Sequence, residues 1–309
     1  MSYDDSSWNK RETFHVDRWS ENPIIHPEMP GLEGEAGSNI NGPSLIRVPD
    51  WVKGRLGRYY LYFAHHRGEH IRLACADKLK GPYRIHEPGV LHASTGPGQG
   101  HIASPDVHVD HKNRQIRMYF HQPGGADSPI PGQVSYVATS EGGLNFQPRK
   151  EVLGKFYFRV VRHRGDWYAF AKNGNKDGII YRSEDGLTNF EAGPHYLPGV
   201  RHTAPWIEGD TLYLLYSLAG DCPERILLST AEVDGNWREW ELSEPEIILE
   251  PERKYEGADL PLAPSSYGPA HGRVRQLRDP FVCREDGGLY MLYSVAGEQG
   301  IAGATLHRT

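Results

Sequence analysis

The chain has 309 residues, enough to bury a large core, and its 38% apolar and 24% charged residues are ordinary globular composition. A net charge of −6 without a basic run speaks against a nucleic-acid surface, and no apolar stretch approaches the roughly 20 residues of a membrane span. The polar first residues lack the apolar segment of a secretion signal, and the three cysteines are widely spaced, so we expect a cytoplasmic protein.

An aromatic strand-like segment occurs five times along the chain. The copies are RYYLYFAHH from Arg58, QIRMYFHQP from Gln115, DWYAFAKNG from Asp166, TLYLLYSLA from Thr211 and GLYMLYSVA from Gly288. Their starts differ by 57, 51, 45 and 77 residues, and each has a further strand-like segment before and after it. Periods of about 40 to 50 residues with several strands per unit are typical of propellers. We predict an all-β fold, a five-bladed β-propeller; a β-sandwich with coincidental aromatic residues is the alternative.

The two ends of the repeat pattern need separate explanations. The fifth blade reaches Thr309 without an outer strand, and we predict that the N-terminal segment TFHVDRW supplies it and closes the ring. The long last step of the repeat reflects an insertion at about 251–276, rich in Pro, Gly and Ser, which we expect to form a long loop over one face. The whole chain, 1–309, is predicted to be a single domain.

Four of the five inner strands are predicted to begin with a proline, and these prolines are Pro43, Pro105, Pro205 and Pro280. The innermost strands of a propeller line its central channel, so residues near these prolines converge. Asp279 precedes its proline and Asp106 follows its own, which by period-two alternation would point both carboxylates into the channel. Two carboxylates in one channel are what glycosidic hydrolysis requires. Arg278 would hold a neighbouring carboxylate ionised.

Two glutamates are candidates for a proton-donating acid. Glu298 follows the last aromatic strand, between Gly297 and Gln299. Glu35 lies in the glycine-rich segment GLEGEAGSN before the first inner strand. Apolar burial or a nearby carboxylate would raise the pKa of either, as an acid at neutral pH needs.

The strand start DPFV, the strand GGLYMLYS and the following AGEQGIAGA resemble the five-bladed propeller glycoside hydrolases of family 43 and its relatives. The resemblance implies an inverting glycosidase in which an Asp before a proline is general base, a second Asp orients substrate and a Glu on another blade is general acid. Asp279 matches the Asp-Pro position, but on the last blade rather than the first. The first blade has Asn41 and Gly42 instead, and since an amide cannot accept the proton, Asn41 is expected to bind substrate.

Further side chains are candidates for binding a sugar. His101 and His202 stand just before inner-strand prolines and could bind hydroxyl groups, replace the missing acid, or hold a metal together with Asp106. Arg159 could bind a carboxylate or several hydroxyls, and Trp206 offers an apolar ring to a sugar face. No cofactor is expected, although a divalent cation in the channel stays open.

These observations predict a glycoside hydrolase acting on a small oligosaccharide or glycoside by inversion. Asp279 or Asp106 would be the base, the other an orienting carboxylate, and Glu298 or Glu35 the acid. The expected partner is a saccharide, with neither nucleic acid nor membrane. Two alternatives remain: a lyase that uses His and Arg near a uronate carboxylate, and a non-catalytic sugar-binding propeller.

Overall fold

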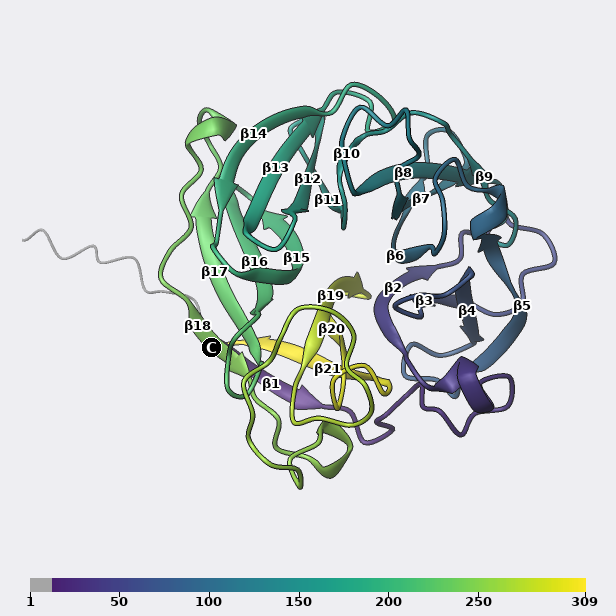
Figure 1. Ribbon diagram of the computed structural model, residues 1–309, viewed down its shortest axis with the longest axis vertical. Coiled ribbons are helices and arrows are strands. Elements are labelled where there is room, and N and C mark those ends of the chain that lie inside the picture. Colours follow the sequence, from purple (N-terminus) through teal and green to yellow (C-terminus); the bar gives the residue numbers. More distant parts are fainter. Residues whose placement is uncertain (1–12) are drawn as a thin grey trace, which may run out of the picture.

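The aromatic segments, buried along most of their length, form the second strands of five antiparallel sheets. The sheets are arranged as a ring in the computed structural model, which describes residues 13–309 (Figure 1). The first blade consists of β2 (Asn41–Arg47), β3 (Tyr59–Ala64), β4 (His70–Ala76) and β5 (Arg84–His92). The second consists of β6 (Ala103–Asp110), β7 (Gln115–Pro123) and β8 (Gln133–Ser140), and both β9 (Gln147–Pro148) and β10 (Gly154–Lys155) pair with β8. The third consists of β11 (Arg159–His163), β12 (Asp166–Asn173), β13 (Asp177–Ser183) and β14 (Glu191–Tyr196). The other two consist of β15 (Val200–Glu208), β16 (Thr211–Leu218), β17 (Ile226–Glu232) and β18 (Glu246–Leu249), and of β19 (Arg278–Glu285), β20 (Gly288–Ser294), β21 (Ile301–Arg308) and β1 (Phe14–Arg18). The predicted five-bladed propeller is confirmed, and the sandwich alternative is wrong.

The N-terminal strand β1 completes the fifth blade. It pairs antiparallel with β21, with Phe14 opposite Arg308 and Arg18 opposite Ala304, and the two strands lie side by side in Figure 1. The Phe14 ring packs edge-on against Trp206 and Tyr213 of the fourth blade, at centroid distances of 6.0 and 5.9 Å. The ring closure expected from the sequence is therefore confirmed.

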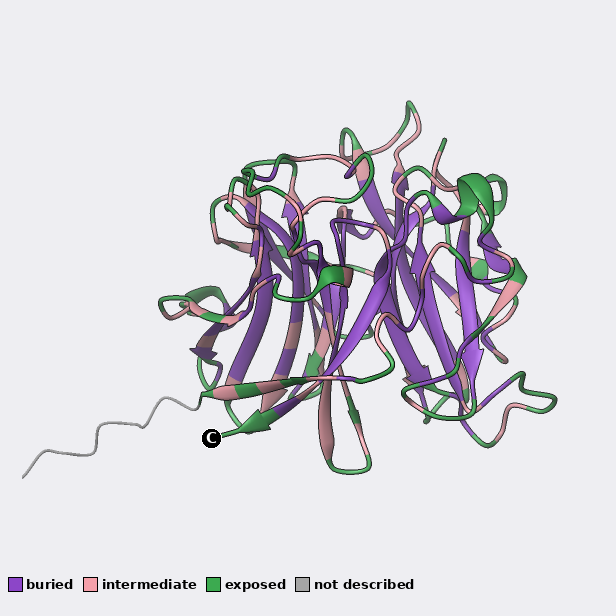
Figure 2. Cartoon of the chain, turned by 90° about the horizontal axis from the view of Figure 1, so that it is seen from below, coloured by how far each residue is buried: buried purple, intermediate pink, exposed green. Residues whose placement is uncertain are grey.

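Aromatic residues of the second strand of each blade form much of the core. Tyr62, Tyr119, Phe170, Tyr216 and Tyr293 are all fully buried. Each such ring removes about 150–250 Å² from water, so the repeated aromatic pattern supplies the packing between neighbouring blades. Figure 2 shows the strands buried through the middle of the molecule and the exposed segments concentrated in the connections.

Three inner strands share a bulge at their first residues. Gly42, Ser104 and Asp279 have φ values of +62°, +53° and +47°, and each precedes a proline. In the fifth blade Arg278 is opposite Ser294 while Phe281 is opposite Leu292, so that β19 has one residue more than β20 over this stretch. Period-two alternation is therefore interrupted where the inner strands begin.

The fourth blade differs from this pattern. Its irregularity lies between Val200 and His202, and Pro205 is regularly paired with Leu214. Pro205 is thus not the structural counterpart of Pro280, although both prolines stand near the start of an inner strand.

The chain between β18 and β19 crosses to the end of the molecule where the inner strands begin. It contains no strand and one short 3₁₀-helix, η4 (Lys254–Glu256); the others are η1 (Gly34–Gly37), η2 (Ala93–Thr95) and η3 (Trp237–Glu239). The Arg201 guanidinium donates hydrogen bonds to the carbonyls of Ser266 and Gly268, both at 2.6 Å. This holds the loop beside β15. Within residues 13–309, no helix has the length and apolar character needed to span a membrane.

Candidate active site

A cavity of about 180 Å³ lies where the inner strands begin, and we call it the axial cavity. Each of the five blades contributes to its lining. The lining residues are Asn41, His66, His101, Ala103, Ser104, His121, Gln133, Phe156, Tyr157, Lys172, Asn175, His202, Gly268, Asp279 and Glu298. The ring fold thus brings together side chains that lie more than 250 residues apart in the sequence.

Asp279 is the carboxylate of the fifth blade in this cavity. Its left-handed backbone, one residue before the proline, is a conformation that Asp tolerates better than most residues. Oδ1 accepts hydrogen bonds from the Tyr157 hydroxyl and lies 3.3 Å from Nε2 of His202, and Oδ2 accepts one from the Ser294 hydroxyl at 3.2 Å. The Asp279 amide donates to Nδ1 of His202 at 3.2 Å, so the proton of this imidazole is on Nε2, facing the carboxylate.

Glu298 is the second carboxylate, in the connection after β20. Oε1 accepts a hydrogen bond from the Arg278 guanidinium at 2.8 Å. Oε2 accepts one from the Asn39 side-chain amide and lies 3.6 Å from Nδ1 of His66. Arg278 in turn lies 3.3 Å from a carboxylate oxygen of Glu224, so Glu298 ends a buried chain of alternating charges.

The two carboxylates have pKa values shifted in opposite directions. Burial and the negative charge of Glu298 raise the pKa of Asp279, outweighing the hydrogen bond from Tyr157. Burial also acts to raise the pKa of Glu298, but His66, Arg278 and Asn39 outweigh it and lower that pKa to about 2. Pairs of carboxyl groups whose environments separate their pKa values are characteristic of acid–base sites.

Four histidines line the cavity, and besides His66 these are His101, His121 and His202. His101 shares a 3.0 Å hydrogen bond between its Nε2 and the Gln133 side chain. The Nδ1 atom of His121 is buried and has no hydrogen-bond partner among the described residues. Burial lowers the pKa of His101, His121 and His202, so these imidazoles are neutral at pH 7.

Five of the residues singled out from the sequence line the axial cavity: Asn41, His101, His202, Asp279 and Glu298. Two more lie directly behind it. Arg278 contacts Glu298, and the Arg159 guanidinium stacks over the Tyr157 ring at 5.3 Å from its centroid.

Asp106 does not line the cavity, which differs from the expectation that it faces Asp279. Its Oδ2 accepts a 2.7 Å hydrogen bond from the Val160 amide on the next blade and a 2.8 Å bond from His108. Ser44, at the matching position of β2, accepts a hydrogen bond from the Val107 amide at 2.9 Å in the same way. The side chains after the bulge tie one inner strand to the next, so Asp106 belongs to the contacts between blades.

Two other expectations also differ from the geometry. Trp206 stacks on Tyr213 at 4.9 Å and packs between blades four and five, because Pro205 is out of step with the other inner-strand prolines. The Glu35 side chain is 91% exposed on η1 and lies 3.7 Å from His65. Neither residue lines the axial cavity.

Sequence reasoning missed Tyr157 and Lys172. Tyr157 has φ +70° and occupies in blade three the position that Asp279 has in blade five, but no proline follows it. Lys172 lies within the aromatic strand β12, where a cation among apolar residues was the available signal.

The geometry is also relevant to the alternative in which His101 or His202 holds a metal ion together with Asp106. Among residues 13–309, no group of three or more His, Cys, Asp or Glu side chains is arranged to hold a metal ion. The carboxylate of Asp106, the ligand considered with His101 or His202, accepts protein hydrogen bonds from Val160 and His108 instead.

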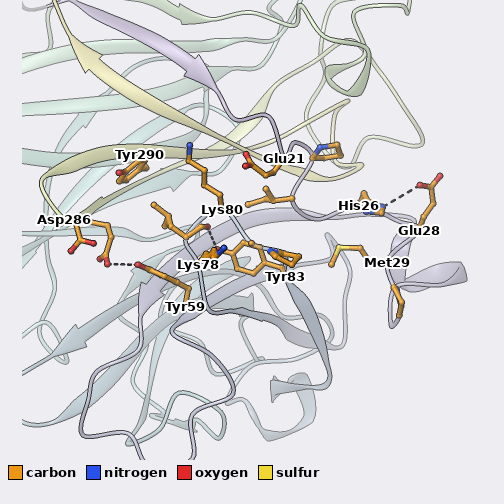
Figure 3. Close-up of a pocket in the computed structure, with 17 residues that line it drawn as sticks. Glu21, His26, Glu28, Met29, Tyr59, Lys78, Lys80, Tyr83, Asp286 and Tyr290 are labelled. Atoms are coloured by element: carbon orange, nitrogen blue, oxygen red, sulfur yellow. Dashed lines mark hydrogen bonds and ion pairs between the residues drawn. The ribbon is translucent and has the colours of Figure 1, made fainter.

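A larger pocket of about 830 Å³ lies on the outside, between the first and fifth blades (Figure 3). Two of its tyrosine hydroxyls are bonded within the pocket: the Tyr59 hydroxyl donates to Glu285 at 2.7 Å, and the Tyr83 hydroxyl donates to the Leu79 carbonyl at 2.7 Å. It holds no pair of buried carboxylates. We therefore place the candidate chemistry in the axial cavity.

No family model matches the chain. Protein R118 of Acanthamoeba polyphaga mimivirus, an uncharacterized protein, is 36% identical to it over 94% of this chain and 90% of R118.

Solved structures similar to this one are glycoside hydrolases. A thermostable family-43 glycoside hydrolase matches with a TM-score of 0.59 and 14% identity, over 87% of this chain and 89% of its own. The catalytic domain of the GH62 α-L-arabinofuranosidase of Coprinopsis cinerea matches with a TM-score of 0.59 and 13% identity, over 95% and 98%. A structure from the GH130 family of mannoside phosphorylases, which contains glycoside hydrolases that target β-1,2 mannosidic linkages in Candida mannan, matches with a TM-score of 0.64 and 13% identity, over 95% and 94%. At these identities the likeness establishes the fold, and the predicted resemblance to family-43 propellers is confirmed at that level.

Proposed function

The chain belongs to the same family as the mimivirus protein R118, and from its axial cavity we propose that it is a glycoside hydrolase acting on a small oligosaccharide or glycoside. The observation that carries this proposal is the pair Asp279 and Glu298, two buried carboxyl groups of one cavity with pKa values shifted apart. Structures of the same fold that cleave glycosides, the family-43 and GH62 enzymes, add support at the level of architecture.

In the proposed mechanism Asp279 is the general acid. Its raised pKa keeps a population protonated at higher pH than for a free aspartate, and that proton passes to the glycosidic oxygen as the C–O bond breaks. Tyr157, Ser294 and His202 then stabilise the carboxylate that remains, since each directs a hydrogen-bond donor at its oxygens.

Glu298 is the proposed general base. Its pKa of about 2 keeps it ionised at every pH at which the protein would work. An ionised carboxylate accepts a proton from the water that attacks the anomeric carbon, and attack from the side opposite the leaving group inverts that carbon. These roles exchange the acid and base expected from the sequence, because Arg278, His66 and Asn39 hold Glu298 ionised.

Elimination from a uronate is the second candidate. It is favoured by one observation, the Lys172 ammonium, which is buried against the cavity near the Tyr157 and His202 side chains. A cation there could neutralise a substrate carboxylate while His121, whose Nδ1 has no hydrogen-bond partner among the described residues, abstracts the neighbouring proton.

Incubation with a panel of small neutral and acidic glycosides and oligosaccharides separates the candidates. We expect release of a reducing sugar whose first-formed anomer, observed by NMR, is inverted, without any ultraviolet-absorbing product. An unsaturated product that absorbs in the ultraviolet would show that the reaction is elimination and not hydrolysis. A rise in melting temperature with sugar, but no product from any glycoside, would indicate a sugar-binding protein without catalytic activity and contradict the proposal.

A further inference from the structure

Lys172 is a buried cation that has no hydrogen-bond acceptor within the part of the chain that the structure describes. Its side chain is 8% exposed and lines the axial cavity. The ammonium lies 5.3 Å from the Phe156 ring centroid and 5.1 Å from that of Tyr267, and among residues 13–309 no carboxylate or carbonyl accepts a hydrogen bond from it. Burying an ammonium in this way is costly unless a partner is present.

The acidic groups of the cavity do not fill this role, because other donors already hold them. Asp279 accepts hydrogen bonds from Tyr157 and Ser294, and Glu298 accepts them from Arg278 and Asn39. Their oxygens are thus already engaged by donors other than Lys172.

The other charged groups on this side of the cavity are paired with one another. Arg201 and Arg278 flank one buried glutamate, Glu224, with nitrogen–oxygen distances of 3.4 and 3.3 Å. Both guanidinium groups also donate to the Gly268 carbonyl, so the loop residue that lines the cavity is fixed beside them. Arg278 also pairs with Glu298 at 2.8 Å, so the two guanidinium groups are balanced by two glutamates, and among residues 13–309 the Lys172 ammonium is the cation on this side of the cavity that forms no ion pair.

We infer that Lys172 forms an oxyanion subsite, so that the saccharide taken by the axial cavity carries a carboxylate or phosphate group that the Lys172 ammonium binds. The inference rests on the proposed function for the identity of the ligand as a sugar. The ammonium is a compact point charge suited to either group, and Asn175, an exposed residue that lines the same cavity, offers an amide donor. The anion would supply the acceptor that the Lys172 ammonium does not find among the described residues.

The lysine is also set to respond to pH. Burial and the positive charges of Arg201 and Arg278 lower the pKa of Lys172 to about 8, against the opposing effect of Glu224 and Asp279. The titratable and charged groups around it are His121 on β7, Arg201 and His202 on β15, Glu224 before β17, and Arg278 and Asp279 on β19. The Phe156 and Tyr267 rings also face it. Anion binding requires the ammonium form, so affinity should fall as pH rises through about 8.

The test is direct binding by calorimetry of glucuronate, glucose 6-phosphate, inorganic phosphate and neutral glucose to the full chain, its Lys172→Met variant and its Lys176→Met variant. Lys176 is exposed on the turn that follows β12, so its replacement removes the same charge near the cavity mouth without touching the lining. We expect the acidic sugars to bind at least tenfold more tightly than glucose. Lys172→Met should abolish that preference, and Lys176→Met should change it less than twofold.

The four ligands distinguish a free anion from an anion carried by a sugar, and the outcomes distinguish failure of the anion subsite from failure of the proposed hydrolysis. Inorganic phosphate binding as tightly as the acidic sugars would support the subsite with a free anion as ligand, and weaker phosphate binding would support an anion carried by the sugar. Equal affinity for glucose and glucuronate in the unmodified protein, or an unchanged preference in Lys172→Met, would overturn the subsite even if neutral glycosides are hydrolysed. Should Lys172→Met fail to fold, loss of the anion preference between pH 7 and 9 in the unmodified protein supports the subsite, and its persistence overturns it. Anion binding with no glycoside cleaved would overturn only the proposed hydrolysis.

Discussion

At the scale of single residues, the environments of two carboxyl groups determine which can donate a proton and which can accept one. Asp279 and Glu298 share a cavity, but only Glu298 has a full guanidinium partner, Arg278 at 2.8 Å. Asp279 has hydroxyl and imidazole donors, which compensate a charge less completely. The opposite pKa shifts follow from this difference in partners.

The rate of glycoside cleavage should therefore depend on pH in one direction. The acid Asp279 must be protonated, so the rate should fall as pH rises through its raised pKa, whereas Glu298, with a pKa of about 2, should produce no acidic limb above pH 4. Tyr157→Phe removes a hydrogen bond that lowers the pKa of Asp279, and so should move the alkaline limb to higher pH.

The matched control for this pH–rate profile is Tyr59→Phe. The Tyr59 hydroxyl also donates to a carboxylate, Glu285 at 2.7 Å, but in the outer pocket. Its profile should coincide with that of the unmodified protein. An alkaline limb that stays in place in Tyr157→Phe, or moves to lower pH, would count against Asp279 as the acid.

At the scale of elements, the bulge at the start of the inner strands separates side chains that enter the cavity from those that join the blades. Asp279 lies in the bulge and lines the cavity, whereas Asp106 and Ser44 follow it and bond the next inner strand. A proline marks the bulge in three blades, but blade three has the same left-handed residue, Tyr157, without one.

Asp106→Asn should consequently weaken the fold rather than the chemistry. The neutral amide loses the attraction of His108 and Arg159 and leaves the Arg159 guanidinium less compensated, at a cost of about 2–4 kcal/mol in the free energy of unfolding. Chemical denaturation measures this loss, and the specific activity of the folded protein should remain within about threefold of the original. Asp127→Asn, an exposed change on the same blade, should cost less than about 0.5 kcal/mol. A large loss of activity without a change in the free energy of unfolding would instead show that Asp106 takes part in catalysis.

At the scale of the whole molecule, the repeat of aromatic strands was sufficient to predict the ring. Periodicity and turn residues report on local structure and on repetition, so the five blades and the closure by the segment from Thr13 could be predicted from the sequence. Asp279, Glu298, Asn41, His101 and His202 could be placed near the axis because they stand at the ends of inner or aromatic strands.

Other features of the site could not be predicted from the sequence, because they depend on strand register and on contacts between blades. The bulge shifts the register by one residue, so alternation wrongly predicted that Asp106 points into the channel with Asp279. In blade four the irregularity lies elsewhere along the strand, so the prediction that Trp206 faces the channel was wrong as well. The partners of Glu298 come from Asn39, His66 and Arg278, which only ring closure brings together, so its lowered pKa could not be predicted from its glycine-rich surroundings.

The most direct test of the account is the rate of glycoside cleavage by Asp279→Asn, compared with Asp286→Asn, an exposed change in the same blade. Asparagine keeps the size of the side chain and tolerates the left-handed backbone, but it cannot donate an acidic proton. The account predicts a fall of about 100- to 10,000-fold in the rate for Asp279→Asn, with a melting temperature close to the original, and an unchanged rate for Asp286→Asn. Cleavage by Asp279→Asn at the original rate would contradict it.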